Sequence, residues 1–255
     1  IKLPGAGEYG VGMVFLPPDA DARSQCETVF NRVIKDANAK LLGWRDVPVK
    51  SDAIGALART TEPFMRQVFI ARGIFTDDEF ERRLYVIRKC AERAVRESAI
   101  EGREYFYIPS LSSSTIVYKG LLLPHQIPQY YQDLTDSSVT SGLALVHSRF
   151  STNTFPTWPL AHPYRYICHN GEINTLKGNV NWMRARQGRL NTELFGEDMQ
   201  KLFPIVYENQ SDSACLDNAL EFLVLGGRSL PHAMMMLIPE PWVANPQMDL
   251  DRRGF

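Results

Sequence analysis

The sequence predicts an α+β protein, and two observations carry this prediction. Short apolar runs of strand length come in neighbouring pairs, and long stretches with apolar residues at helical spacing separate the pairs. This grouping is typical of antiparallel sheets covered by helices, rather than of regular strand–helix–strand alternation. The chain has 255 residues, of which 44% are hydrophobic, so one or two domains with a sizeable core are expected.

The first half of the chain contains the clearest helix signals. Asp19 follows Pro17–Pro18 and is a good N-cap for the first amphipathic stretch. Thr76 and Glu79 form a capping-box pattern at the start of the second. The predicted helices span residues 20–42 and 77–95, and the predicted strands lie at residues 9–16, 44–49 and 66–71.

The second half predicts four more strands and a group of helices. Gly226–Gly227 is a helix stop, and Ser229 can cap a further helix through Pro231. The predicted strands are residues 104–111, 114–123, 141–150 and 164–169, and the predicted helices are residues 125–134, 175–187, 213–225 and a segment after Ser229.

Composition and charge exclude several classes of function. The formal net charge is −1, so no overall field attracts nucleic acid or an anionic membrane. No apolar run is long enough to span a bilayer, and the first residues lack a signal-peptide core. We therefore expect a cytoplasmic protein without nucleic-acid or membrane partners. The basic residues of one predicted helix are interpreted as a solvated face: Lys177, Arg184, Arg186 and Arg189.

The cysteines and an N-terminal glycine motif predict neither a metal nor a cofactor site. The four cysteines, Cys26, Cys90, Cys168 and Cys215, form no CxxC pair and no zinc-like spacing. Residues 5–10 match GxGxxG, but a strand follows this motif, whereas a dinucleotide site requires a strand before it and a helix after it.

Cys168 and His169 invite interpretation as a nucleophile and its base. If residues 164–169 form a strand, however, adjacent side chains point to opposite faces. The thiolate–imidazole contact that activates a cysteine is then disfavoured. We interpret Cys168 as a structural thiol.

Three neighbouring features are open to both structural and functional interpretations. Asn170–Gly171 is typical of a hairpin turn, but an asparagine amide and an adjacent backbone N–H can also stabilise an oxyanion. Arg149 can form a structural ion pair or clamp a carboxylate. Asp212 can cap a helix or bind an ammonium group, and the second role requires that Ser211 or Ser213 supplies the cap.

The segment from His147 to Arg186, HSRFSTNTFPTWPLAHPYRYICHNGEINTLKGNVNWMRAR, resembles the glutaminase domain of glutamate synthase large subunits. These domains are class II glutamine amidotransferases within the N-terminal nucleophile hydrolases. The similarity extends through GWRDVPV, IVYKGLLLP and NQSDSACLDNALEFLVLGG, so it covers residues 1–255 as one partial glutaminase domain.

The resemblance implies a four-layer αββα sandwich and the hydrolysis of L-glutamine to glutamate and ammonia. It implies that Arg149 and Thr152 bind the substrate carboxylate side, that Asp212 binds the α-ammonium, and that Asn170 and Gly171 form the oxyanion hole. It further implies that the ammonia reaches a downstream FMN-binding synthase domain of the same polypeptide, which carries an iron–sulfur cluster and converts 2-oxoglutarate to glutamate. The electron donor, either a small NAD(P)H-oxidising subunit or ferredoxin, is left open.

The chain departs from this family in one respect. The family nucleophile is an N-terminal cysteine whose own α-amine is the base, whereas this chain begins at Ile1 and its first cysteine is Cys26, inside a predicted helix. We therefore expect an N-terminally incomplete domain that does not itself turn over glutamine. The alternative is a non-catalytic amino-acid-binding or assembly domain. Another N-terminal nucleophile amidotransferase, making a sugar amine or a purine precursor, is disfavoured by HNGEIN and by the proline-rich loop after Phe150.

Overall fold

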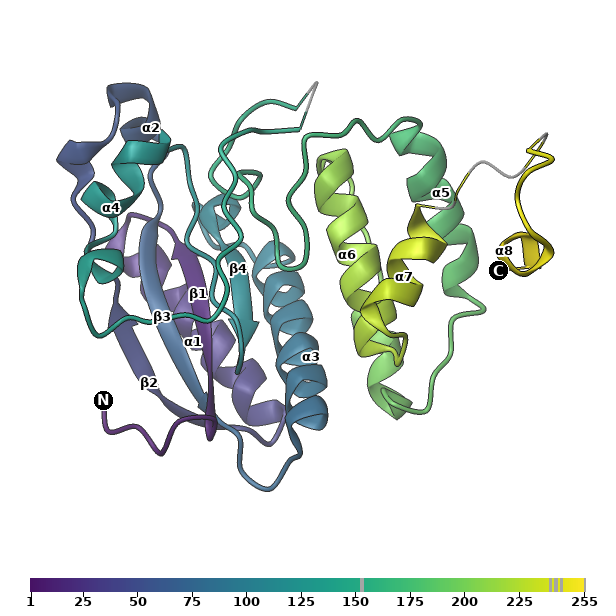
Figure 1. Ribbon diagram of the computed structural model, residues 1–255. Helices are drawn as coiled ribbons and strands as arrows, with labels where there is room; N and C mark the ends of the chain where they lie inside the picture. The colour runs from purple at the N-terminus through teal and green to yellow at the C-terminus, as the bar shows by residue number, and fades with distance from the viewer. Residues whose placement is uncertain (152–153, 239, 241–242, 244, 255) are drawn as a thin grey trace.

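The computed structural model describes residues 1–151, 154–238, 240, 243 and 245–254 (Figure 1). Its strands are β1 (Tyr9–Leu16), β2 (Lys40–Asp46), β3 (Phe64–Ala71) and β4 (Tyr107–Ser112). Its helices are α1 (Ala20–Asp36), α2 (Ala56–Thr60), α3 (Asp77–Arg96), α4 (Ile127–Tyr130), α5 (Leu176–Gln187), α6 (Asp212–Leu225), α7 (Leu230–Leu237) and α8 (Leu250–Gly254). This mixture of an antiparallel sheet with packed helices confirms the α+β prediction.

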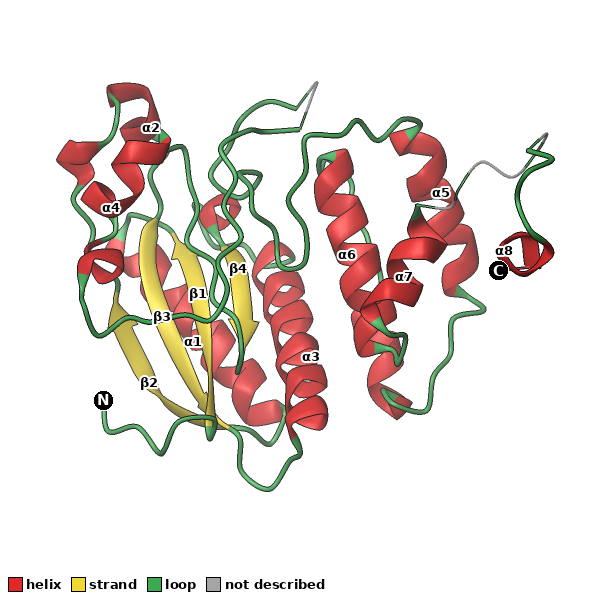
Figure 2. Cartoon of the chain, viewed as in Figure 1, coloured by secondary structure: helices red, strands yellow, loops and turns green. Residues whose placement is uncertain are grey.

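The described strands form one antiparallel sheet in the order β2–β3–β1–β4 (Figure 2). Strand β1 lies inside the sheet and is buried on both faces. Val14 and Leu16 point to one core, whereas Met13 and Phe15 point to another. A continuous apolar run, rather than an alternating one, is what a strand covered on both sides requires.

Helices α1 and α3 cover one face of the sheet (Figure 1). The capping box of α3 forms as predicted: Thr76 Oγ1 accepts a hydrogen bond from the N–H of Glu79, whose carboxylate accepts one from the N–H of Thr76. Helix α3 packs closely on β1 at Gly10, where there is no room for a side chain. A Cβ atom on Gly10 would lie only 2.6 Å from the side chain of Leu84. The last glycine of the GxGxxG match therefore lies within a strand and provides helix–sheet packing.

Loops and short helices cover the other face of the sheet. Tyr130 and Tyr131, at the end of α4, pack there together with Trp158. Trp158 belongs to the proline-rich loop and is 2% exposed, and its indole N–H donates to the carbonyl of Ala58. Trp158 thus anchors the proline-rich loop against this face of the sheet.

Helices α5, α6 and α7 lie beyond α3, on the far side from the sheet (Figure 1). Tyr85 and Val86 of α3 pack against Cys215 and Phe222 of α6. Helix α3 is therefore shared between two cores, one with the sheet and one with the C-terminal helices.

Several predicted elements were wrong in extent or type. The first helix ends at Asp36 rather than residue 42, because Asn38 adopts a left-handed conformation with φ of 51° and the chain then enters β2. Residues 114–123, 141–150 and 164–169 form no strand.

These segments form no strand because their backbone N–H groups donate to side chains rather than to a neighbouring strand. A strand persists only where a neighbour accepts and donates along its length. The N–H groups of Arg165, Tyr166 and Ile167 instead donate to the carboxylate of Asp217, and the N–H of Val117 donates to Ser110 Oγ. Residues 141–146 are exposed to solvent.

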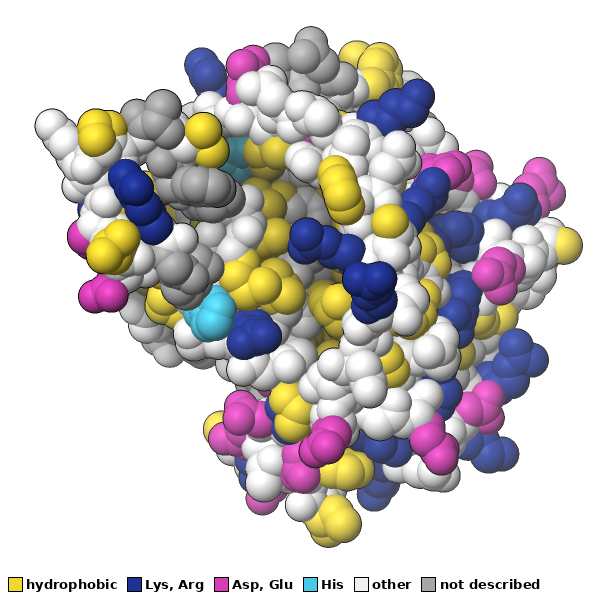
Figure 3. Space-filling view, turned by 90° about the vertical axis from the view of Figure 1, so that its right-hand side faces the viewer, with side chains coloured by type: hydrophobic (Ala, Val, Ile, Leu, Met, Phe, Trp, Pro, Cys, Tyr) yellow, Lys and Arg dark blue, Asp and Glu magenta, His cyan; other side chains and the backbone are white. Residues whose placement is uncertain are grey.

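Figure 3 shows the face that carries α5 and α7, where lysine and arginine side chains reach the surface among exposed apolar ones. Lys177, Arg184, Arg186 and Arg189 are all exposed. Arg184 pairs with the exposed Glu208 at 2.7 Å. The prediction of a solvated basic face is confirmed. Among the helices of the described residues, none combines the length and the apolar character needed to cross a bilayer.

Candidate active site

Helix α6 begins at Asp212 because Ser211 caps it. Ser211 Oγ accepts a hydrogen bond from the N–H of Ala214 at 3.1 Å, and the hydroxyl of Tyr164 lies 2.8 Å from the same oxygen. The carboxylate of Asp212 is therefore not needed as the cap. This was the condition set by the sequence for a binding role at Asp212.

The carboxylate of Asp212 is half-buried, and its two oxygens differ in the hydrogen bonds that they accept. Its Oδ1 accepts from the N–H of Ser213 at 2.6 Å, whereas Oδ2 receives only a long contact, 3.4 Å, from the N–H of Ile173. Oδ2 can therefore accept another donor, such as an ammonium group. The contact with Ile173 also brings the loop after Gly171 to the start of α6.

Asn170 and Gly171 lie in this loop and are exposed. Oδ1 of Asn170 lies 3.0 Å from Nε2 of His147. With its oxygen engaged in this way, the NH₂ group of Asn170 can serve as a donor. Gly171 follows directly, and an asparagine amide next to a backbone N–H is an arrangement that can stabilise an oxyanion.

His169 contacts α6 rather than Cys168. Its Nε2 lies 2.7 Å from Ser213 Oγ, which also accepts a hydrogen bond from Ser151 Oγ at 2.6 Å. Cys168 forms no hydrogen bond or ion pair with a base among the described residues. The rejection of a Cys168–His169 dyad is therefore supported, although the strand used to argue it is not there.

The other predicted residues are less fully placed. The side chain of Arg149 is exposed and forms no hydrogen bond or ion pair within the described part of the chain, so its guanidinium is available to an anion. Its backbone N–H donates to Nδ1 of His147 at 3.0 Å. Thr152 lies outside the described residues.

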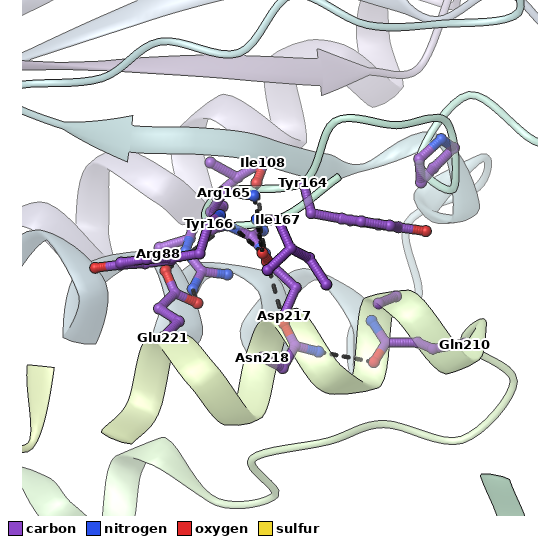
Figure 4. Close-up of polar contacts among 12 residues, drawn as sticks. Arg88, Ile108, Tyr164, Arg165, Tyr166, Ile167, Gln210, Asp217, Asn218 and Glu221 are labelled. Atoms are coloured by element: carbon purple, nitrogen blue, oxygen red, sulfur yellow. Dashed lines mark hydrogen bonds and ion pairs between the residues drawn. The ribbon is translucent and has the colours of Figure 1, made fainter. Parts of the chain in front are cut away.

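The segment that precedes Asn170 is held by Asp217, a fully buried residue of α6 (Figure 4). Its carboxylate accepts from the N–H groups of Arg165, Tyr166 and Ile167, at 3.3, 2.8 and 3.2 Å. The guanidinium of Arg165 lies 3.7 Å from the same carboxylate and donates to the carbonyl of Ile108 in β4 at 2.7 Å. Asp217 and Arg165 thus tie the loop to both α6 and the sheet.

A second buried arginine completes this network (Figure 4). Arg88 of α3 pairs with Glu221 of α6 and, at 3.2 Å, with Glu92. The guanidinium of Arg165 lies farther from the same carboxylates, 3.5 Å from Glu92 and 3.8 Å from Glu221. Burial raises the pKa of Asp217, whereas Arg88 and Arg165 outweigh burial and lower the pKa of Glu92.

Two buried lysines lie beside the network. Burial lowers the pKa of Lys89 to about 7, and its amine donates to the carbonyl of Pro204 at 2.7 Å. Burial, helped by Arg165, lowers the pKa of Lys119 well below its usual value, and its amine donates to the carbonyl of Pro159 at 2.7 Å. Neutral amines can satisfy these carbonyls without placing further charge in the interior.

Three cysteines are unsuited to nucleophilic chemistry. Burial raises the pKa of Cys26 and of Cys215 to about 11, and burial also raises the pKa of Cys90. The reactive species of a cysteine is its thiolate, which these sites disfavour near neutral pH. Within the described residues, no group of three or more His, Cys, Asp or Glu side chains is arranged to hold a metal ion.

A cavity of about 600 Å³ adjoins the loop and the start of α6. This volume falls in the range of small-molecule sites. Asp212 lines the cavity, whereas Asn170, Gly171 and Arg149 do not. Its walls are formed by Thr154, Phe155, Thr157, Leu160, residues 172–176 and residues 209–212.

Sequence reasoning missed the residues that hold the loop. Asp217 lies in the middle of an apolar helix, and Arg165 lies between two tyrosines in an apolar stretch. A charged residue embedded in such surroundings signals a buried pair. His147 and Ser213 gave no comparable signal, because polar residues at the ends of predicted elements are common.

A comparison of the sequence with known families identifies the family of this chain. The family model of the class-II glutamine amidotransferases matches residues 1–255. This chain belongs to that family. As a class-II glutamine amidotransferase, it has relatives among the glutamate synthases.

The similarity to these relatives covers nearly the whole chain. The chain is 53% identical to the glutamate synthase [NADPH] large chain of Bacillus subtilis, over 100% of its own residues and 17% of that protein. It is 42% identical to the glutamate synthase [NADH] of Saccharomyces cerevisiae, over 100% of its own residues and 12% of that protein. It is 41% identical to the ferredoxin-dependent glutamate synthase of Pyropia yezoensis, over 96% of its own residues and 16% of that protein. The amidotransferase chain thus corresponds to less than a fifth of each relative.

Proposed function

We propose that this chain forms the glutaminase part of a glutamate synthase, in which L-glutamine is hydrolysed to glutamate and ammonia. The observation that carries the proposal is the loop joining Asn170 and Gly171 to Asp212 beside the cavity. His169 contacts Ser213, and Ile173 contacts Asp212, so the chain on both sides of Asn170 and Gly171 is held against α6. Family membership supports the same conclusion.

The groups complement glutamine chemically. Arg149 offers a guanidinium without a partner in the described residues, and it would bind the α-carboxylate. Asp212 would accept from the α-ammonium through Oδ2, its less occupied oxygen. The carbonyl oxygen of the side-chain amide would then receive donors from Asn170 and Gly171. Thr152 is proposed to line the carboxylate side of the pocket.

The oxyanion donors would act in the step in which negative charge develops on the carbonyl oxygen of the substrate amide. When a nucleophile attacks the amide carbon, the carbonyl oxygen becomes an oxyanion. The NH₂ of Asn170 and the N–H of Gly171 would stabilise this oxyanion more strongly than the neutral carbonyl. Burial raises the pKa values of Cys26, Cys90 and Cys215, which disfavours them as the attacking thiol. The proposed nucleophile is the N-terminal cysteine typical of the resembled family.

We extend the proposal to the larger protein. Ammonia would pass to an FMN-binding synthase part that also carries an iron–sulfur cluster and produces glutamate from 2-oxoglutarate. The described residues do not themselves fit an iron–sulfur cluster, because their four cysteines lie on α1, α3, the loop and α6. The names of the relatives include NADPH, NADH and ferredoxin, and these names support the proposal that the electron donor belongs to one of these classes.

The complete fold is proposed to be the four-layer αββα sandwich of the N-terminal nucleophile hydrolases. The described sheet and the layer of α1 and α3 would supply one half of it. The proposal is supported by family membership and by the apolar core on the second face of the sheet, around Phe15 and Met65. A cytoplasmic location is proposed with it.

The decisive experiment is a glutaminase assay of the full-length protein with Asn170→Ala. We expect kcat to fall about 10²- to 10³-fold, because one oxyanion donor is lost. The free energy of unfolding should change by less than about 0.5 kcal/mol, because Asn170 is exposed. The matched control is Asn191→Ala, which removes an exposed asparagine outside the site.

Two results would contradict the proposal. A kcat within twofold of wild type in Asn170→Ala would remove the oxyanion role. Glutamine binding without ammonia release by the folded wild-type protein would support the alternative, a non-catalytic amino-acid-binding domain.

A further inference from the structure

We propose that His147 is a positioning residue that holds the amide of Asn170 with its NH₂ group directed to the substrate. This inference rests on the proposed function, because it assigns a purpose to the oxyanion donor. The observation behind it is a continuous chain of contacts from the backbone of Arg149, through the imidazole of His147, to the side chain of Asn170.

The backbone of Arg149 fixes the tautomer of His147. The N–H of Arg149 donates to Nδ1 at 3.0 Å, so Nδ1 acts as an acceptor and the ring proton lies on Nε2. Nδ1 also lies 3.2 Å from the carbonyl oxygen of Arg149. A proton on Nδ1 would face the Arg149 N–H at the shorter distance, which favours the Nε2–H tautomer.

The tautomer of His147 in turn fixes the orientation of the side-chain amide of Asn170. Nε2–H donates to Oδ1 of Asn170 at 3.0 Å. Rotating the amide by half a turn would place its NH₂ against Nε2–H, so two donors would face each other and the hydrogen bond would be lost. The correct orientation presents both N–H bonds of Asn170 away from His147, where a developing oxyanion can receive one.

A second histidine holds the imidazole of His147 in place. The ring of His162 lies 4.5 Å from the ring of His147, centroid to centroid, and is 6% exposed. Burial, together with His147 and His169, lowers the pKa of His162 to about 4, so the ring is neutral at physiological pH. Neither nitrogen of His162 has a hydrogen-bond partner among the described residues. His162 therefore acts as a flat packing surface and does not compete for Nε2 of His147.

This arrangement links two parts of the proposed site. The backbone that carries the carboxylate-binding Arg149 also sets the proton on His147, and His147 sets the amide of Asn170. A ring without nitrogen at position 147 could keep the packing against His162 but could not hold the amide. Loss of the imidazole should therefore reduce kcat, which depends on the oxyanion, with little effect on KM.

The test is a double-mutant cycle in the full-length protein, with glutaminase activity as the readout. His147→Phe keeps the ring contact and removes the hydrogen bond, so we expect kcat to fall about 3- to 10-fold, with KM within twofold. In the Asn170→Ala background, the same substitution should change kcat less than twofold, because there is no amide left to hold. His125→Phe, an exposed histidine far from the loop in sequence, is the matched control and should change nothing.

A pair of polar variants separates positioning from general damage. His147→Gln can place an amide N–H near the position of Nε2 and should recover kcat to within about twofold of wild type. His147→Asn is too short to do so and should behave like His147→Phe. This comparison remains available if the phenylalanine variant does not fold.

Each outcome either supports or overturns the inference. An equal loss in both backgrounds would show that His147 acts independently of Asn170, and no loss in the wild-type background would show that it does not act at all. A glutamine variant no better than the asparagine variant would also count against it. These failures differ from that of the proposed function, which is marked by an Asn170→Ala protein that retains wild-type kcat.

Discussion

The loop that carries the proposed oxyanion donors has two very different ends. Its first part, Arg165–Ile167, is bound through three backbone N–H groups to the buried carboxylate of Asp217. Its second part, around Asn170 and Gly171, is exposed and held by single hydrogen bonds to His147, Ser213 and Asp212. Only Cys168 and His169 therefore separate a rigidly held backbone from groups that solvent and substrate can reach.

The difference between these ends indicates how a small exposed site can be precise. Donors to an oxyanion must be accessible, so they cannot themselves be buried. They must also be held in place before reaction, because reorienting them during the reaction would reduce their benefit. Anchoring the preceding residues in the interior satisfies both requirements.

The largest expected effect comes from breaking the buried end. Asp217→Ala removes one of the carboxylates that face Arg165 and leaves three buried or half-buried backbone N–H groups without their acceptor, so we expect a loss of about 3–5 kcal/mol in the free energy of unfolding. Denaturant titration measures this loss. Asp217→Asn retains one acceptor oxygen and should lose less stability, while still lowering kcat by loosening the loop.

A surface ion pair is the control for this prediction. Glu208→Ala removes the partner of Arg184 on the exposed face, where the two side chains are 71% and 41% exposed. We expect a change of less than about 1 kcal/mol. Similar losses for Asp217→Ala and Glu208→Ala would show that the buried network does not hold the loop.

An intermediate effect is expected at Ser211, the cap of α6, which directly precedes Asp212. Ser211→Ala removes an acceptor for the N–H of Ala214 and a partner of Tyr164, so unfolding should become easier by about 2 kcal/mol. Ser229→Ala at α7 is the control, since its bond to the N–H of His232 is 3.4 Å long and exposed. A larger loss at Ser229 than at Ser211 would contradict this account.

The smallest effect concerns the pH dependence of stability, through Lys89. Its pKa is about 7 in the folded protein and 10.5 when unperturbed, so between pH 7 and 8 the unfolded chain binds more protons than the folded one. Stability therefore rises with pH in this window, by about 1 kcal/mol per pH unit from this lysine. The buried Lys119 should add to the rise, because its pKa is lowered too.

Lys89→Met tests this contribution. Free energies of unfolding at pH 7 and pH 8 should differ by about 1 kcal/mol less in the variant than in the wild type. The slope is compared rather than the absolute stability, because the variant also loses the hydrogen bond to Pro204. An unchanged slope would show that Lys89 remains charged in the interior.

The sequence predicted local features of the fold well. The capping box of α3, the cap of α7 at Ser229 and the extent of β1 appeared as expected, because each depends on residues within one or two turns. Three predicted strands failed at residues 114–123, 141–150 and 164–169. Their apolar patterns were suitable for strands, but whether a strand forms depends on a partner that no local pattern reveals.

The sequence indicated which residues could form the site, but not which residues hold them in place. Family resemblance selected Asn170, Gly171, Arg149, Thr152 and Asp212, and complementary chemistry with glutamine supports that choice. Their roles remain predictions. Neither resemblance nor spacing indicated that Asp217 would gather three N–H groups from a loop about fifty residues earlier, or that His147 would meet Asn170.

The sequence by itself determined the α+β class, the capped starts of several helices and the family to which this chain belongs. These follow from hydrophobic period, capping side chains and long motifs, all of which are local or additive along the chain. Only the tertiary structure decided where charge is buried, which imidazole contacts which amide, and which extended segments pair. Those outcomes depend on contacts between residues far apart in the sequence, whose free energies are set by burial and geometry rather than by residue type.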